Sequence, residues 1–349
     1  MIAYPNSQSQ ASQAFREALA ERKQVLPFGL GQSLGQMVED RHILALSSRD
    51  LPAVVSVEPD NLLAVVGAGI TVDGLDRALA GTGLYWPVTG PHGRSLGGIM
   101  GHGLLGAEAM ARGTMCDWIL GTTMLTPQGE IVSSGGRTLK NVSGYDLTRM
   151  CWRARGSLAM SLSFTVKLVP RPSVCPAMEF KVRSLRAAAG HLEAIIRERL
   201  GLQALRLVGD KDGLRLVAWL CGFPELVASQ EERLKGMLGE PSDLFEDGFE
   251  YFNHSDAIFS EGHGLAKVFA GPRKALLGVA GSLSWIGEYS FVLDLGGGRI
   301  AFRDAPGPIE AQAAKAGLAV ISGAVFKAVG PLFRRLKASL DPRNSFLVL

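Results

Sequence analysis

Hydrophobic and polar positions form patterns clear enough to predict elements over the first half of the chain. The runs Ala53–Val57 and Leu62–Val66 are strand-like, and residues 58–61 (EPDN) between them are typical of a turn. Thr71 precedes the periodic apolar run Val72–Leu79, so we predict that it caps a helix there. Three further predictions are a helix over 9–23, a hairpin over 118–132 with its turn at 127–129, and a strand over 161–168.

The pattern changes after a proline-rich stretch, Pro170–Pro176. Beyond it the order strand, helix, strand, strand, helix is predicted over residues 178–182, 185–200, 204–208, 214–220 and 224–238. Such an order builds an antiparallel sheet with its helices on one face. Past Ser242 the pattern is weak until a helix predicted over 330–340. We therefore expect a domain boundary near Pro170–Pro176.

Composition excludes several classes of protein. Glycine makes up 43 of 349 residues without a regular period, and 47% of residues are hydrophobic, so the chain is neither collagen-like nor disordered. The interleaved charges sum to +3, which predicts no nucleic-acid surface. The longest uncharged stretch, 16 residues from Ala78 to Gly93, is shorter than a spanning helix, and the start MIAYPNSQSQ is unlike a signal peptide. We expect a cytoplasmic protein, peripheral on the membrane only through partners.

The cysteines and histidines predict no metal centre in this chain. Four cysteines lie far apart and form no Cys-x-x-Cys pair: Cys116, Cys151, Cys175 and Cys221. We therefore expect reduced, buried thiols and no iron–sulfur cluster held by this chain. His254 and His263 are nine positions apart and lack the i, i+4 spacing of a helical metal pair.

Glycines gather in several clusters far apart in the sequence. Residues 101–106 (GHGLLG) match the dinucleotide fingerprint formally, but no clear strand precedes them, which argues against a Rossmann site. The other clusters are Gly29 with Gly31, Gly97 with Gly98, and Gly156. Glycine lets a backbone approach a ligand closely and point its N–H groups at phosphate oxygens. These residues by themselves fit one long anionic ligand or tight turns between strands equally well.

Five segments resemble a known family. They are VEPDNLLAVVGAGITVDGLDRALAGTG, SLGGIMGHGLLG, ARGTMCDWILGT, GGRTLKNVSGYDLTRM, and the pair DLGGG and RLKASLDPRNSF near the end. Over residues 27–170 the chain resembles the flavin-binding domain of the vanillyl-alcohol oxidase / p-cresol methylhydroxylase (PCMH) superfamily. More narrowly, it is similar to the FAD-binding small-subunit family of bacterial glycolate oxidases.

The resemblance implies an α+β fold with three regions. A two-lobed PCMH-type FAD-binding domain would span residues 1–174, and a ferredoxin-like antiparallel cap, facing substrate or partner, would span 175–290. Residues 291–349 would return to the FAD domain. The cofactor would be noncovalent FAD, because the first glycine loop contains no His, Cys or Tyr.

The resemblance also implies which residues contact the cofactor, and it leaves the catalytic residues unassigned. The implied FAD-binding residues are Gly29, Leu30, Gly31, Gln32, Ser33, Pro87, Ser95, Leu96, Gly97, Gly98, Gly101, His102, Gly103, Gly156, Ser157 and Met160. The third loop departs from the family pattern: Ala159 replaces a glycine, and Arg153 and Arg155 are additional cations. Lys140, Asn141, Tyr145 and Asp146 form another dense polar group, either structural or facing the flavin or substrate.

By resemblance, the function is that of an FAD-dependent oxidoreductase subunit in a glycolate-oxidase-like 2-hydroxy-acid dehydrogenase. In this family the small subunit acts with a catalytic flavoprotein and an iron–sulfur subunit, so electrons would pass from flavin to an iron–sulfur partner. Whether this chain alone turns over the small 2-hydroxy acid stays open. Two alternatives remain: a non-catalytic scaffold of the same fold that has lost FAD, and a free-standing FAD-dependent oxidase.

Overall fold

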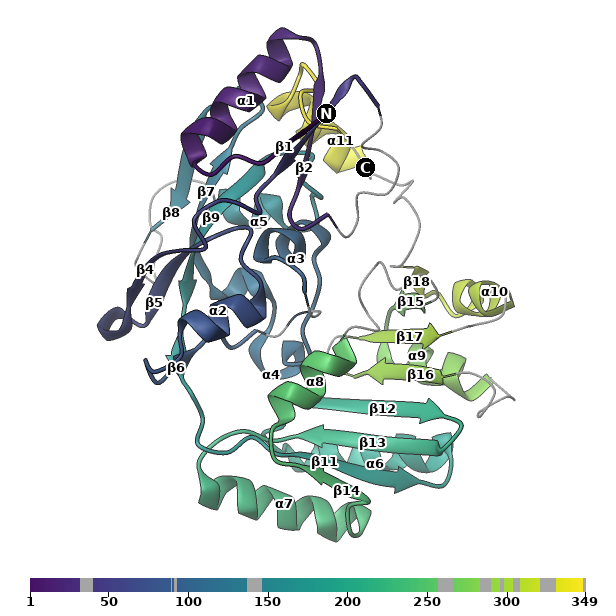
Figure 1. Cartoon of the computed structure of the whole chain (residues 1–349). Coiled ribbons are helices and arrows are strands. Elements are labelled where there is room, and N and C mark those ends of the chain that lie inside the picture. Colours follow the sequence, from purple (N-terminus) through teal and green to yellow (C-terminus); the bar gives the residue numbers. More distant parts are fainter. Residues whose placement is uncertain are drawn as a thin grey trace.

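The protein has two parts, shown in Figure 1 with the N- and C-termini both in the upper one. The computed structural model describes residues 1–31, 40–88, 90, 93–136, 146–256, 266–282, 290–295, 298–303, 308–320 and 331–347. The upper part holds the elements before residue 170 and the last helix, and the lower part is a long antiparallel sheet with its helices. Within the described ranges, no helix is both long and apolar enough to cross a membrane.

The first lobe of the upper part is a three-stranded parallel sheet with one helix. Its elements are β1 (Ile2–Ala3), α1 (Gln8–Ala20), β2 (Gln24–Phe28) and β3 (Ile43–Ser47), and the strand order is β1-β3-β2. Helix α1 begins because the Ser7 side chain accepts a hydrogen bond from the Gln10 N–H. Ala11, Phe15 and Ala18 recur three or four positions apart and are buried in the lobe's core, as an amphipathic helix requires.

The second lobe is a five-stranded antiparallel sheet in the order β4-β5-β9-β7-β8. Its strands are β4 (Val54–Glu58), β5 (Leu63–Gly67), β7 (Ile119–Leu125), β8 (Ile131–Gly135) and β9 (Met160–Lys167). Its helices are α2 (Val72–Ala78), α3 (Leu96–His102), α4 (Ala109–Arg112) and α5 (Leu147–Cys151), while β6 (Leu84–Tyr85) and β10 (Val169–Pro170) pair separately. The predicted N-cap of helix α2 is confirmed, because the Thr71 hydroxyl accepts a hydrogen bond from the Gly74 N–H at 2.9 Å.

The lower part, which we call the cap, is one eight-stranded antiparallel sheet. Its order is β14-β11-β13-β12-β16-β17-β15-β18. The strands are β11 (Ala177–Val182), β12 (Ala204–Asp210), β13 (Gly213–Trp219), β14 (Asp243–Phe245), β15 (Ala266–Ala270), β16 (Ser290–Asp294), β17 (Arg299–Arg303) and β18 (Ala319–Val320). The helices are α6 (Leu185–Glu198), α7 (Pro224–Leu238), α8 (Gly248–Asp256), α9 (Arg273–Ser282) and α10 (Pro308–Lys315).

The cap sheet has two differently covered faces because its side chains alternate along each strand. Met178, Phe180 and Val182 join a large core with residues of α6, α7, α9 and α10, so those four helices cover one face. Ala177 and Trp219 point the other way, where Trp219 stacks on Phe252 of α8. The predicted antiparallel sheet with helices on one face is therefore confirmed, with α8 added on the second face.

The cap extends further along the chain than we expected. The return to the FAD-binding part was predicted from residue 291, but β16 pairs with β12 and with β17, so both β16 and β17 lie inside the cap sheet. Asp294 of the DLGGG motif forms a buried ion pair there with Arg299. The return is made by helix α11 (Pro331–Leu340) and the residues that follow it. The pairing of distant strands decides this boundary, and local patterns carry little information about it.

The expectation of four reduced thiols is wrong for one pair. Val174 and Gly222 form an antiparallel bridge with hydrogen bonds in both directions. Their neighbours Cys175 and Cys221 are thereby brought together and form a disulfide. Cys116 and Cys151 are free and buried. Spacing alone could not reveal the pair, because 46 positions separate the two cysteines.

Candidate functional site

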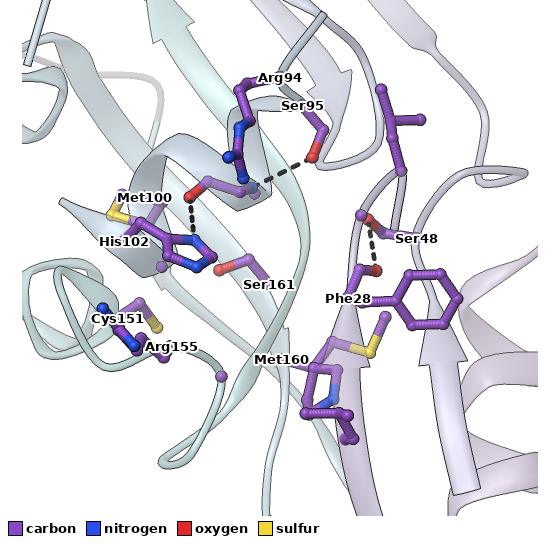
Figure 2. A pocket seen from close by; sticks show the side chains of 18 of the residues that line it. Phe28, Ser48, Arg94, Ser95, Met100, His102, Cys151, Arg155, Met160 and Ser161 are labelled. Carbon is purple, nitrogen blue, oxygen red and sulfur yellow. Dashed lines mark hydrogen bonds between the residues drawn. The ribbon is translucent and has the colours of Figure 1, made fainter. Parts of the chain in front are cut away.

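A cleft lies where the end of β2, helix α3 and residues 151–161 meet, as Figure 2 shows. Its lining residues are Leu26, Pro27, Phe28, Gly29, Leu30, Gly31, Ser48, Arg94, Ser95, Gly97, Gly98, Met100, Gly101, His102, Cys151, Arg155, Gly156, Ala159, Met160 and Ser161. The cavity volume is about 90 Å³. Because ligand pockets usually measure ~300–1,000 Å³, a dinucleotide would extend beyond this cavity along the open cleft.

The first wall of the cleft is the end of β2 with the loop that follows it. The Ser47 hydroxyl donates to the Gly29 carbonyl at 2.9 Å, and the Ser48 N–H donates to the Phe28 carbonyl at 2.9 Å. Figure 2 also shows the Ser48 hydroxyl bonded to the Phe28 carbonyl. The end of β3 therefore fixes the loop that carries Gly29 and Gly31.

The second wall is α3, whose first N–H groups are already used within the protein. The Gly97 N–H donates to the Ala68 carbonyl at 2.7 Å, and the Gly98 N–H donates to the Ser95 hydroxyl at 3.1 Å. These glycines therefore serve close packing. A Cβ on Gly97 would lie 3.0 Å from the Ala68 carbonyl oxygen, and one on Gly29 would lie 2.1 Å from the Ser95 hydroxyl oxygen. The first two walls touch at Gly29 and Ser95.

The third wall, residues 153–160, is held by backbone bonds to the end of α3. The Arg153 N–H donates to the Met100 carbonyl at 3.0 Å, and the Arg155 N–H donates to the Gly101 carbonyl at 2.8 Å. Arg153 and Arg155 have φ values of 61° and 48°, in the left-handed region that non-glycine residues rarely occupy. Gly156, at φ 75°, packs against Pro27 of the first wall. The three glycine clusters thus meet at one place.

The described lining of the cleft is cationic. It includes Arg94, which is only 5% exposed, together with Arg155, and the described lining contains no Asp or Glu. Figure 2 shows the Arg94 side chain extending along the first turn of α3. A pocket with two guanidinium groups and no carboxylate favours an anionic ligand, and guanidinium groups suit phosphate oxygens in particular.

Two further side chains determine what chemistry the cleft can support. The Nδ1–H of His102 donates to the Gly98 carbonyl at 3.0 Å, which fixes the orientation of the imidazole ring beside α3. Burial raises the pKa of the Cys151 thiol to about 11, although a hydrogen bond with Ser161 lowers it in part. Since the thiolate is the nucleophilic form, Cys151 is a poor nucleophile near neutral pH.

The sequence-derived site residues separate into three groups. Ten line the cleft: Gly29, Leu30, Gly31, Ser95, Gly97, Gly98, Gly101, His102, Gly156 and Met160. Four do not line it: Leu96 and Ser157 are buried beneath it, Gly103 ends α3, and Pro87 is buried elsewhere. Gln32 and Ser33 lie outside the described residues, as do Lys140, Asn141, Tyr145 and His263.

Sequence reasoning missed Arg94 and Ser48 as lining residues. Arg94 directly precedes the SLGG motif, so its place in the chain was a usable signal. Ser48 follows a strand without any motif, and only the parallel pairing of β2 with β3 brings it to the cleft. Arg155, recognised as an additional cation in the third loop, does line the cleft.

Comparisons with known proteins agree with this geometry. Residues 1–135 match the family described as FAD binding domain. Glycolate oxidase subunit GlcD of Bacillus subtilis is 26% identical over 56% of this chain and 42% of that protein. D-lactate dehydrogenase of Archaeoglobus fulgidus is 30% identical over 49% and 39%, and glycolate oxidase subunit GlcE of Escherichia coli is 26% identical over 52% and 55%. The chain thus spans about half the length of these relatives.

A solved structure of alkyldihydroxyacetonephosphate synthase superimposes with a TM-score of 0.76 at 14% identity, covering 99% of this chain and 76% of that one. This likeness confirms the predicted PCMH-type fold. The chemistry of the cleft also fits the diphosphate of FAD, because Arg94 and Arg155 line it and no carboxylate is among the described lining residues. Residues 1–135 are therefore an FAD-binding domain, with FAD as its cofactor.

Proposed function

We propose that this chain is the FAD-binding subunit of a 2-hydroxy-acid dehydrogenase complex of the glycolate oxidase type. The observation that carries the proposal is the coincidence of two findings. The segment that matches FAD-binding domains supplies two of the three walls of a cationic cleft, and the relatives that align with it include two named subunits of glycolate oxidase. When bound, FAD would supply the hydride-accepting chemistry that oxidation of a 2-hydroxy acid needs, and an iron–sulfur partner would serve as the electron acceptor of the complex.

The chain's own residues would bind and orient the cofactor. Arg94 and Arg155 would face the diphosphate, while Gly29 and Gly97 allow the walls to pack closely around it. The hydrogen bond to the Gly98 carbonyl fixes the orientation of the His102 ring in the cleft. Similarity to D-lactate dehydrogenases as well as glycolate oxidase subunits supports a small 2-hydroxy acid as substrate.

The first experiment is the visible spectrum of the purified chain, read again after denaturation to release noncovalent flavin. Turnover of glycolate and D-lactate is then measured with an artificial electron acceptor. Near-stoichiometric released flavin, with turnover only in the presence of partner subunits, supports the proposal. A colourless protein that takes up no added FAD overturns it and favours the scaffold. Full turnover by the isolated chain favours a free-standing enzyme instead.

The two arginines of the cleft give a specific prediction. Replacing Arg94 or Arg155 by methionine should weaken FAD binding about 10- to 100-fold, because a charge-assisted hydrogen bond contributes ~1.5–3 kcal/mol. Riboflavin, which has no phosphate, should bind equally to wild type and variants. Fluorescence titration of the apoprotein measures both affinities. Arg77→Met is the matched control, since Arg77 is exposed on α2 and does not line the cleft. Equal losses for riboflavin would contradict a contact with the diphosphate.

A further inference from the structure

The last described residues of the chain return to the cofactor cleft. Phe346 lies beside Val25 of β2 in parallel, where the Val25 N–H donates to the Ser345 carbonyl at 2.7 Å and the Leu347 N–H donates to the Val25 carbonyl at 2.8 Å. The Phe346 ring packs on Phe15 of α1 at 4.8 Å between centroids. The C-terminal segment therefore extends the sheet whose strand β2 leads into the first wall of the cleft.

Lys337 of α11 connects this segment to the third wall. Its ammonium group donates to the Asp341 carboxylate at 2.6 Å, to the Ser157 carbonyl at 2.6 Å and to the Phe346 carbonyl at 2.8 Å. Three acceptors match the three protons of an ammonium group. Asp341 in turn accepts from the N–H groups of Ser345 and Phe346 at 2.8 and 2.9 Å. Ser157 adjoins Gly156, which lines the cleft.

Charge and burial distinguish this network from an exposed ion pair on the surface. Helix α11 buries Lys337 and leaves Leu332 80% exposed, so a polar link rather than apolar packing fixes its inner side. Burial lowers the pKa of Lys337, against the opposing effect of its hydrogen bond to Asp341. For Asp341, burial raises the pKa, but the bonds from Lys337 and from the backbone outweigh it and leave the pKa below 3.8. Removing one partner of such a buried pair leaves the other uncompensated.

The loop that Lys337 contacts needs external support. Arg153, Arg155 and Gly156 all have positive φ within four residues, and the first two are not glycine. Backbone in this region persists only where surrounding contacts hold it. The carbonyls of α3 hold one side of the loop through its N–H groups, and Lys337 holds the other through the Ser157 carbonyl.

We propose that Lys337 is a positioning residue for FAD binding, which holds residues 153–157 in the shape that forms the third wall of the cleft. It acts through the Ser157 carbonyl and does not line the cleft itself. This inference rests on FAD binding in this cleft and is independent of substrate and partners. It extends the binding machinery about 200 residues past the segment, 1–135, that matches FAD-binding domains.

The test compares FAD affinity among full-length apoproteins by fluorescence titration. Lys337→Met should bind FAD about 10- to 100-fold more weakly than wild type, as expected for loss of a hydrogen bond from a charged group. The visible circular dichroism of the flavin at saturating FAD should also change, because the third wall shifts. Gln128→Ala is the matched control: it removes a 3.1 Å bond to the Leu340 carbonyl at the end of α11 and leaves Ser157 untouched.

FAD affinity and flavin dichroism together distinguish the possible outcomes. Lower affinity with an altered flavin dichroism in Lys337→Met, and wild-type behaviour in Gln128→Ala, support the proposal. Equal losses in both variants overturn it in favour of general anchoring of α11, and wild-type affinity in Lys337→Met overturns it directly. If Lys337→Met does not fold by far-ultraviolet dichroism, Lys337→Gln takes its place and is judged by the same criteria, because it loses the charge and has too few donor protons for the three acceptors. Failure of wild type to bind FAD overturns the proposed function and with it this inference.

Discussion

Replacing Gly29 by alanine is expected to weaken FAD binding about 10- to 100-fold, since overpacking a well-packed site costs ~1–3 kcal/mol. The added Cβ would lie 2.1 Å from the Ser95 hydroxyl oxygen and 3.2 Å from the Ser95 Cβ. That hydroxyl caps α3 by accepting from the Gly98 N–H, so it cannot rotate away without releasing the first turn of the helix. The first two walls must therefore separate. Titration of the apoprotein with FAD measures the loss.

Two further variants separate this clash from general damage. Gly236→Ala is the matched control, because a Cβ at Gly236 of α7 meets nothing within 4 Å. It should leave FAD affinity unchanged. In the double variant, Ser95→Ala removes the clashing oxygen and should restore part of the affinity lost in Gly29→Ala, a coupling that a double-mutant cycle measures. Wild-type affinity in Gly29→Ala would show that the walls do not need to touch here.

Breaking the Cys175–Cys221 disulfide is expected to lower the free energy of unfolding of the cap by about 4 kcal/mol. The disulfide closes a loop between residues 46 positions apart, and the chain-entropy relation gives this value for a loop of that size. The double variant Cys175→Ser/Cys221→Ser should therefore unfold at a clearly lower denaturant concentration. Trp219, fully buried two positions before Cys221, lies where its fluorescence can report the transition.

A reducing agent provides the control for this prediction. It should lower the unfolding midpoint of the wild type and leave the double variant unchanged, because Cys116 and Cys151 are already free. Identical midpoints for oxidised wild type and double variant would mean that the disulfide contributes nothing to stability.

Local signals predicted those elements whose formation depends on neighbours in the sequence. The Thr71 cap and the five elements from β11 to α7 were found because capping and periodicity are properties of short windows. Strands β14 to β18 were missed because they are two to five residues long and exist through pairing with distant strands. The extent of the cap and the disulfide follow from the same long-range pairing.

The residues of the site likewise divide into those that local sequence signals predict and those that only the folded structure brings together. Glycines such as Gly29 and Gly97 could be found because tight packing restricts the residue type and leaves a motif. Arg94 directly precedes the SLGG motif, whereas Ser48 carries no such mark, since only the assembled walls make it a lining residue. Lys337 lies in the segment RLKASLDPRNSF, which resembles the family, but its contact could not be predicted, because its partner Ser157 is 180 positions away and offers only a backbone carbonyl. Every residue has a backbone carbonyl, so the sequence does not indicate which one a distant side chain contacts.

The bridge between Val25 and Phe346 also determines when the cleft can be completed during protein synthesis. The ribosome synthesises β2 near the start of the chain. It synthesises residues 345–347, which pair with β2, much later. At ~5–20 residues per second, the first wall waits about 15–60 s for them. A growing chain can fold its first helix and strands during that interval, but the cleft lacks this support until residues 345–347 have been made. FAD binding at full affinity would then follow the synthesis of Phe346, and a chain that stops before this residue would bind the cofactor more weakly.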